Sequence, residues 1–265
     1  MNTAPKFKLS KWYMDCVTES GEVFIGYCAQ VQWRALVIHY SSALTRQRDS
    51  GTRNRTSTRR CPAPALAGSI LRWSSPRLSV EGTWEAIDPP CRRTLLATEA
   101  GSVEWRCEMP RARAEISLEH GRQVRGLGYG EFLEMTIAPW ELPIDELRWG
   151  RFVSDTDAMT WIDWSGAHPL TVVVCNGNVS SSAAVSDRLI TVDNKRAILR
   201  IEEPRVLREG PLARTVLAKI PGVRKLLPER ILKTHECKWR SRGTLEEDGR
   251  IRSTGWVIHE VVRWS

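Results

Sequence analysis

Apolar and polar positions alternate with a period of two along most of this 265-residue chain. This is the pattern of β-strands that have one packed and one exposed face. In the segment 23–33, every second residue from Val23 to Trp33 is apolar. Glycine, proline, aspartate and asparagine separate such segments, as expected of turns. The pattern predicts strands at residues 11–17, 23–33, 35–44, 69–74, 78–86, 92–98, 102–108, 112–118, 128–138, 147–154, 158–165, 169–176, 187–193, 196–203, 234–243 and 255–264.

Many short, evenly spaced strands with Gly/Pro turns are typical of an antiparallel β-sandwich or β-barrel, so the predicted fold class is all-β. The segment 119–127 is polar and contains glycine. It predicts a boundary between two packed β modules, residues 1–122 and 123–265.

One segment has a helical spacing instead. Apolar residues at positions 212, 213, 216, 217 and 220 predict one short helix near 212–220, which ends at Pro221-Gly222. Basic residues surround it. The helix can pack on a barrel mouth as a plug, which is the favoured interpretation, or the segment 212–233 can make a peripheral contact with a membrane surface.

Tryptophan is unusually frequent, with 12 residues against 4 tyrosines and 4 phenylalanines. The indole ring is wide and apolar, so it suits either a dense core or the lining of a large apolar cavity. Hydrophobic residues make up 42% of the chain, enough to bury a core.

The chain is basic, with a formal net charge of +8. Six arginines lie in the run 46–60, but no aromatic residue is interleaved with them. A single-strand binder stacks bases on aromatic rings, so we favour a solvated loop and expect no nucleic-acid partner.

The seven cysteines form no C-x-x-C pair and no Cys/His metal spacing, so we expect buried thiols and no metal site. There is no bilayer-spanning apolar stretch and no signal-peptide pattern, so we expect a cytoplasmic protein. Glycine-rich phosphate loops and the G-x-S-x-G and H-E-x-x-H motifs are also missing. Their absence argues against dinucleotide, nucleoside triphosphate, serine-hydrolase and zinc-protease chemistry.

Glu131 is the residue of greatest chemical interest. It shares one face of a predicted strand with Tyr129, Leu133, Met135 and Ile137. Burial disfavours the ionised carboxylate, and a protonated acid in an apolar cavity can add a proton to an alkene. Aromatic faces can stabilise the carbocation that follows. An alternative is favoured as strongly as the catalytic role. In it, Glu131 pairs with an arginine such as Arg148 or Arg151 and only holds two strands together.

Three further residues are candidates for a second acid, a base or a water-holding group. Glu260 lies among apolar residues of the last predicted strand, although it can instead pair with a lysine. Asp163 lies between two tryptophans, although a local turn role is favoured. His235 shares a strand face with a cysteine and a tryptophan and can serve as a general base or as a core residue.

Several motifs carry a family resemblance. Tyr129-x-Glu131 is followed by Pro139-Trp140 and by Trp149-Gly150-Arg151-Phe152. Together with the opening segment KWYMDCVTESGEVFIGYCA and the close of the chain, they resemble the superfamily of carotenoid hydratases (hydroxyneurosporene synthases) and tocopherol cyclases. The resemblance covers most of the chain. It implies a lipocalin-like (calycin-like) fold of two β modules, with a cavity for a long apolar molecule.

These observations lead to one functional hypothesis. The protein is expected to be a cofactor-independent lyase or cyclase of isoprenoid biosynthesis that hydrates, isomerises or cyclises a hydrophobic polyene-like substrate, with Glu131 as proton donor. The residues expected to line the substrate pocket are Tyr27, Trp33, Tyr129, Met135, Trp140, Trp149 and Trp161. The alternative is a non-catalytic carrier of a lipid, pigment or quinone. The sequence makes no prediction of the oligomeric state.

Overall fold

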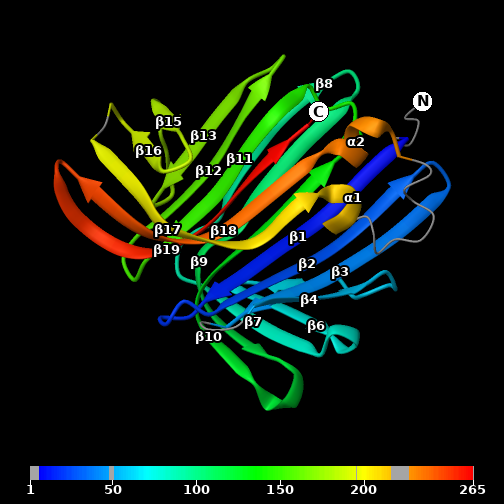
Figure 1. The fold of residues 1–265 in the computed structure, drawn as a ribbon, viewed down its shortest axis with the longest axis horizontal. Helices are drawn as coiled ribbons and strands as arrows, with labels where there is room; N and C mark the ends of the chain where they lie inside the picture. Colours follow the sequence, from blue (N-terminus) through cyan, green and yellow to red (C-terminus); the bar gives the residue numbers. More distant parts are fainter. Residues whose placement is uncertain (1–5, 48–50, 195, 216–226, 265) are drawn as a thin grey trace. The chain divides into compact units, whose positions relative to one another are not determined.

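The computed structural model of the protein divides into two compact units, Met1–Leu142 and Pro143–Ser265. Each unit is built on one antiparallel sheet (Figure 1). The predicted all-β, lipocalin-like fold is therefore confirmed. The structure describes residues 6–47, 51–194, 196–215 and 227–264.

The first unit holds a ten-stranded sheet. Its strands are β1 (Phe7–Val17), β2 (Val23–Trp33), β3 (Leu36–Arg46), β4 (Thr52–Ser57), β5 (Ala65–Ala67), β6 (Ile70–Ser75), β7 (Val80–Ala86), β8 (Cys91–Thr98), β9 (Gly101–Ser117) and β10 (Gln123–Met135), with the 3-10 turns η1 (Pro76–Leu78) and η2 (Glu119–Gly121). Their order in space is β4-β3-β2-β1-β10-β9-β7-β6-β5, and β8 pairs with β9 outside this path. The first and last strands of the unit are thus neighbours inside the sheet.

The second unit holds a nine-stranded sheet. Its strands are β11 (Ile144–Val153), β12 (Ala158–Gly166), β13 (Leu170–Cys175), β14 (Asn178–Val179), β15 (Ala183–Val185), β16 (Leu189–Val192), β17 (Ala197–Pro211), β18 (His235–Glu247) and β19 (Arg250–Arg263). The order in space is β14-β13-β12-β11-β19-β18-β17-β16-β15. The first and last strands are again neighbours, so the two units share one strand order apart from β8, although no sequence repeat is evident.

The division between the units differs from the sequence-based boundary at residues 122 and 123. The segment 119–127 forms η2 and the start of β10, and it joins β9 to β10 within the first sheet. His120 and Gly121 have positive φ values of 59° and 74° there. The polar and glycine residues therefore mark a tight connection between neighbouring strands. The units divide between Leu142 and Pro143 instead.

Glycines in β10 allow it to approach β1 closely. A Cβ atom at Gly128 would lie 2.4 Å from the backbone oxygen of Asp15 and 2.9 Å from Cδ1 of Trp84, so no side chain fits. The register between β9 and β10 also shifts on both sides of Gly130. The extra residues lie on β9, because Gly128, Gly130 and Glu131 are opposite Ala112, Met109 and Cys107 in turn. Such a bulge bends the strand that carries the extra residues, which here is β9 beside Glu131.

Each unit has its own hydrophobic core, and tryptophan contributes to both. Trp73 and Trp84 belong to the core of the first unit, and Trp161 belongs to that of the second. A Cβ atom at Gly150 would lie 2.1 Å from the Trp161 ring, so this glycine makes room for the indole. Three of the 12 tryptophans therefore belong to these cores, and one of them is Trp161, which the sequence placed in a substrate pocket.

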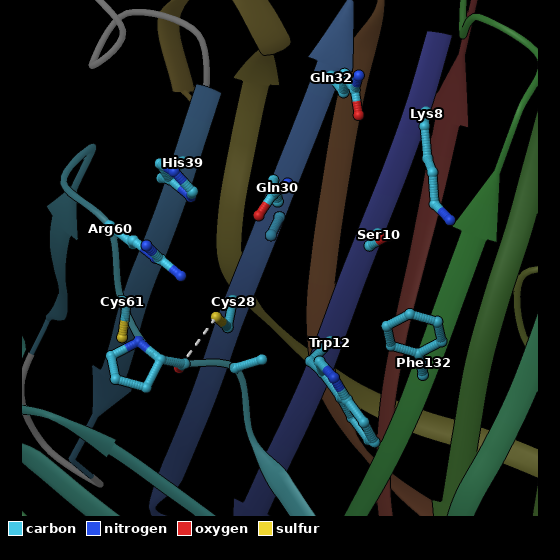
Figure 2. A pocket seen from close by; sticks show the side chains of 13 residues that line it. Lys8, Ser10, Trp12, Cys28, Gln30, Gln32, His39, Arg60, Cys61 and Phe132 are labelled. Carbon is cyan, nitrogen blue, oxygen red and sulfur yellow. Dashed lines mark hydrogen bonds between the residues drawn. The ribbon is translucent and has the colours of Figure 1, made fainter. Parts of the chain in front are cut away.

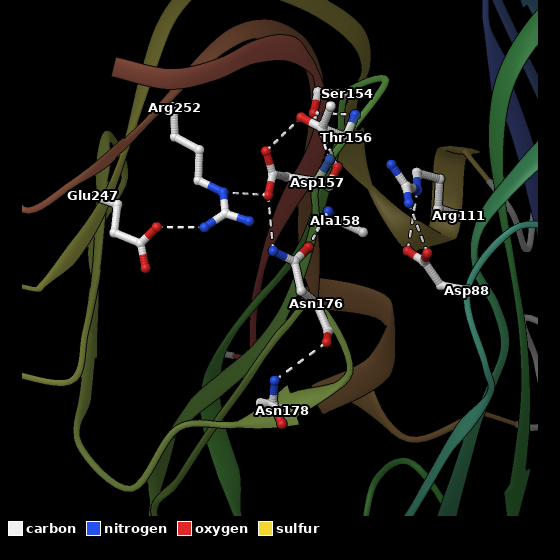
Figure 3. Close-up of polar contacts among 10 residues, drawn as sticks. All are labelled: Asp88, Arg111, Ser154, Thr156, Asp157, Ala158, Asn176, Asn178, Glu247 and Arg252. Atoms are coloured by element: carbon white, nitrogen blue, oxygen red, sulfur yellow. Dashed lines mark hydrogen bonds and ion pairs between the residues drawn. The ribbon is translucent and has the colours of Figure 1, made fainter. Parts of the chain in front are cut away.

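A buried aspartate fixes the connection between β11 and β12 (Figure 3). The Asp157 carboxylate accepts hydrogen bonds from Thr156 Oγ1 at 2.7 Å, Asn176 Nδ2 at 2.8 Å and Arg252 Nε at 2.7 Å. Burial alone would raise the pKa of this carboxyl, but the neighbouring side chains of Ser253, Thr156, Asn176 and Arg252, in that order of effect, lower the pKa below its usual value. Asp157 is therefore a structural carboxylate that stays ionised.

The arginine run contributes the outermost strand of the first sheet. Residues Thr52–Ser57 form β4, which the sequence did not predict as a strand. Arg55 on this strand pairs with Glu119 at 2.8 Å. Positive charge on an outermost strand discourages pairing with other chains.

The predicted helix near 212–220 begins as α1 (Leu212–Thr215), and α2 (Glu229–Lys233) follows later. Residues 216–220 lie outside the described residues, as does much of the segment 212–233. The plug and the membrane contact therefore both stay predictions. Within the described ranges, no helix is long and apolar enough to cross a membrane.

Candidate functional site

Glu131 lies on β10 with its side chain buried at 5% exposure. It is opposite Tyr13 of β1 on one side and Cys107 of β9 on the other. Trp105 Nε1 donates a hydrogen bond to Glu131 Oε2 at 2.6 Å, and the Tyr129 hydroxyl donates to the same oxygen at 2.8 Å. Two donors on one oxygen orient the carboxyl group within an aromatic surrounding.

A second carboxylate–tyrosine pair lies beside the first. The Tyr13 hydroxyl donates to Asp15 Oδ2 at 2.8 Å, and Asp15 is fully buried. Asp15 is directly opposite Tyr129, and Tyr13 is directly opposite Glu131. Asp15 and Glu131 occupy diagonal positions of the β1–β10 pair, where the two residues are typically about 7–8 Å apart in the backbone.

Tyr27 of β2 completes this group. It is opposite Tyr13, and the two rings meet edge to face with centroids 5.3 Å apart. The Tyr13 and Tyr129 rings are also T-shaped, at 6.0 Å. We call these residues the carboxylate–tyrosine cluster: Tyr13, Asp15, Tyr27, Trp105, Cys107, Tyr129 and Glu131.

Alternation along β1 separates this cluster from the core of the first unit. Met14 and Cys16 belong to the hydrophobic core, and they alternate with Tyr13 and Asp15. Successive side chains of a strand point to opposite faces, so the cluster lies on the face of β1 that is opposite the core.

Burial controls the protonation of the cluster's weaker acids. It raises the pKa of Tyr129 well above the usual value, and nearby negative charge on Cys107 and Glu131 would raise it further. Burial likewise raises the pKa of the Cys107 thiol, although a hydrogen bond with Tyr129 opposes this. Both groups therefore keep their protons at neutral pH. Tyr129 serves as a hydrogen-bond donor, and Cys107 is not a thiolate nucleophile.

The remaining predicted pocket residues of the first unit lie near the other end of these strands. Met135 is buried at the end of β10 and is opposite Leu9. Trp33 and Trp140 form a T-shaped pair with ring centroids 5.0 Å apart. Phe7 packs on Trp140 at 5.8 Å. Trp33, Trp140 and Phe7 form a second aromatic group, whereas Tyr27 and Tyr129 belong to the cluster itself.

The other predicted acids lie in the second unit. Glu260 pairs with Lys238, which is almost fully buried and lies 4.9 Å from the Trp149 ring centroid. Asp163 accepts a hydrogen bond from Thr171 Oγ1 at 2.6 Å. His235 is the first residue of β18 and is half-buried. The structure thus associates Glu260 with Trp149 but does not bring Asp163 and His235 into that group.

The arginines suggested as partners of Glu131 have contacts within the second unit. Arg148 pairs with Glu146 and with Asp187, the latter at 3.2 Å. Arg151 is fully buried and donates to the backbone oxygen of Trp256 at 2.9 Å. Among the residues that the structure describes, no group of three or more His, Cys, Asp or Glu side chains is arranged to hold a metal ion.

Four residues of the cluster were not predicted from the sequence as site residues: Tyr13, Asp15, Trp105 and Cys107. A signal for two of them is present, because Tyr13-x-Asp15 has the same spacing as Tyr129-x-Glu131. Trp105 and Cys107 carry no such signal. Their role depends on the register between β9 and β10.

A buried histidine in the second unit leads to a pH prediction. His259 Nε2 lies 2.9 Å from Ser241 Oγ, and its ring stacks on Trp239. Burial, followed by the positive charge of Lys238, lowers the pKa of His259 to about 4. An unfolded histidine titrates near pH 6.5, so between about pH 6.5 and 4 only the unfolded chain binds this proton. As the pH falls through that window, this histidine should therefore lower the unfolding free energy by about 1.4 kcal/mol per pH unit. Above about pH 6.5 it should have no effect on the unfolding free energy.

Urea unfolding of the full chain at pH 7, 6 and 5 measures this dependence. The matched variant His259→Gln should lose that part of the slope. An identical pH dependence in both proteins would show that folding leaves the pKa of His259 unchanged, which would contradict the prediction.

Comparison with known proteins places the fold among solved structures. One similar structure is a putative AttH from Nitrosomonas europaea, with 9% identity, a TM-score of 0.55, and coverage of 97% of this chain and 92% of that one. A second is CghA with Sch210972, with 11% identity, a TM-score of 0.60, and coverage of 98% and 89%. A third is kievitone hydratase from Nectria haematococca, with 12% identity, a TM-score of 0.56, and coverage of 99% and 90%. At these identities the likeness shows a shared fold. No protein-family model and no curated protein sequence matches the chain.

Proposed function

We propose that the protein is a cofactor-independent enzyme that hydrates, isomerises or cyclises a hydrophobic, isoprenoid- or polyene-like substrate by acid catalysis. The observation that carries the proposal is the buried Glu131 carboxyl, which Trp105 and Tyr129 hold in a fixed orientation among aromatic rings. The shared fold with kievitone hydratase, a hydratase by name, supports hydration as one of the possible reactions.

The proposed chemistry begins with the protonated Glu131. Its proton forms a new C–H bond with one alkene carbon, using the π electron pair, and leaves a carbocation at the other carbon. The faces of Tyr13, Tyr27 and Tyr129 can stabilise this cation. Water then adds and loses a proton to a carboxylate, which gives hydration. Loss of a neighbouring C–H proton gives isomerisation, and attack by an internal hydroxyl gives cyclisation.

Asp15 is our first candidate for the second acid or base. It belongs to the same unit as Glu131 and has its own tyrosine donor. A carboxylate at a diagonal position can accept the proton that the attacking water releases while Glu131 is deprotonated. Glu260, Asp163 and His235 stay predicted candidates for this role.

Isotope labelling tests the proposal. Extraction of the purified protein with organic solvent and mass spectrometry identify any bound lipid. That lipid, or an acyclic carotene dispersed in detergent, is then incubated with the protein in D2O and in H2-18O. We expect one carbon-bound deuterium per product and, for hydration, one 18O. A bound lipid that is recovered unlabelled and unchanged would favour the carrier instead.

A further inference from the structure

The first unit contains a pocket of about 490 Å³ that does not include the carboxylate–tyrosine cluster (Figure 2). Trp12 and Phe132 line it, and they are the sequence neighbours of Tyr13 and Glu131. Alternation along β1 and β10 therefore puts the pocket and the cluster on opposite faces of the same two strands. The volume is in the range of sites for small organic molecules. The pocket is lined by Lys8, Ser10, Trp12, Cys28, Ala29, Gln30, Gln32, His39, Arg60, Cys61, Pro62, Ala63 and Phe132.

One wall of the pocket is aromatic. Trp12 and Phe132 are directly opposite each other on β1 and β10, and their ring centroids lie 5.1 Å apart at a tilt of 59°. Both side chains are half-buried, so part of each ring is accessible from the pocket. The guanidinium of Arg106 lies 4.2 Å from the Phe132 centroid and holds that ring in place. A planar ring can pack against this wall with little loss of side-chain freedom.

The other side of the pocket is polar. Gln30 and Gln32 of β2 and His39 of β3 line it, and Gln30 is directly opposite His39. Figure 2 shows Gln30 between Arg60 and Lys8 in the view, with Trp12 and Phe132 lower in the picture. Amide and imidazole groups both donate and accept hydrogen bonds, so a ligand with polar substituents can be oriented here.

The charge of the pocket is positive. Lys8 Nζ lies 2.9 Å from Glu134 Oε2, so its charge is largely balanced. Arg60 is exposed, and among the described residues no carboxylate pairs with it. One guanidinium is therefore uncompensated, which suits a single negative charge better than the roughly two charges of a phosphate monoester. The guanidinium fork also matches the geometry of a carboxylate.

We propose that this pocket binds a planar aromatic carboxylate. Its ring packs against Trp12 and Phe132, and its carboxylate receives hydrogen bonds from Arg60. The proposal is independent of the proposed reaction, because Glu131 belongs to the other face of the sheet.

Titration calorimetry with 2-naphthoate on the full chain tests this site. The variant Arg60→Gln should weaken 2-naphthoate binding about fivefold to tenfold, as expected for the loss of one partly exposed charged hydrogen bond. Arg59→Gln is the matched control, since Arg59 is also exposed but does not line the pocket. It should leave the affinity unchanged. The neutral analogue 2-naphthamide should bind Arg60→Gln and the parent protein equally.

Three results would overturn the proposal: no binding of 2-naphthoate, equal affinity for 2-naphthoate and 2-naphthamide, or equal losses in Arg59→Gln and Arg60→Gln. Both arginines are exposed, so neither substitution should prevent folding. Glu131→Gln should bind 2-naphthoate as the parent protein does, which keeps failure of this site distinct from failure of the proposed reaction.

Discussion

Glu131→Gln should lower turnover of the polyene substrate by about a hundredfold to ten-thousandfold, the usual contribution of a positioned general acid. Glutamine has nearly the same shape, and its amide oxygen can still accept the hydrogen bonds from Trp105 Nε1 and the Tyr129 hydroxyl. It cannot, however, deliver a proton to an alkene. Ligand affinity and the near-ultraviolet circular dichroism should therefore change little. Single-turnover kinetics and a binding titration with the same substrate separate the two effects.

Glu134→Gln is the matched control for this experiment. Glu134 lies three residues further along β10 on the opposite face, where it pairs with Lys8. Its replacement removes the same charge from the same strand without touching the cluster, so turnover should be unaffected. If both variants retain full turnover, Glu131 is not the acid, and its hydrogen bonds serve only to hold the strands.

Trp84→Ala should lower the unfolding free energy by about 3–5 kcal/mol, the usual cost of removing a buried aromatic side chain from a core. Trp84 is fully buried in the core of the first unit. The indole fills the space that Gly82 and Gly128 leave open, with Cβ positions at 2.6 Å and 2.9 Å from its ring atoms. Urea unfolding followed by circular dichroism measures the change.

Trp84 also has a polar role that a second variant isolates. Its Nε1 donates to the backbone oxygen of Asp15 at 2.7 Å. Trp84→Phe keeps much of the apolar volume but removes this hydrogen bond, which should cost about 0.5–1.5 kcal/mol. Asp15 belongs to the cluster, so this variant should also reduce turnover. A loss below 1 kcal/mol in Trp84→Ala would contradict tight packing around the indole.

The strands were largely predictable because alternation is a local signal. Residues 23–33 alternate clearly and form β2 with those bounds. The short outer strands β5, β14 and β15 were missed, because three residues or fewer cannot show a period of two. The boundary between the units was misplaced for a different reason. A glycine-rich polar segment marks a turn, but only the pairing of distant strands shows whether the turn lies within a sheet.

The candidate site was predictable only in part. Alternation correctly indicated that Glu131 is buried, since its strand neighbours of the same face are apolar or aromatic. The contribution of Tyr13 and Asp15 follows from the pairing of β1 with β10, which are separated by more than a hundred residues. The period of two shows which side chains share one face of a strand. It does not show what that face contacts. For this reason Trp161 was assigned to a pocket although it fills a core.

In each sheet the first and last strands of the unit are paired with each other, and this has a consequence for folding. Leu9 is paired with Met135 in the first unit, and Glu146 is paired with Arg263 in the second, so each unit joins the two ends of its own segment. Contacts of such high sequence separation make folding slow. During synthesis, β1 cannot pair with β10 until β10 has also been made. Tyr13 and Asp15 therefore contact Glu131 only after that point. The same adjacency of ends makes each unit a natural candidate for circular permutation, with new termini placed in a surface turn.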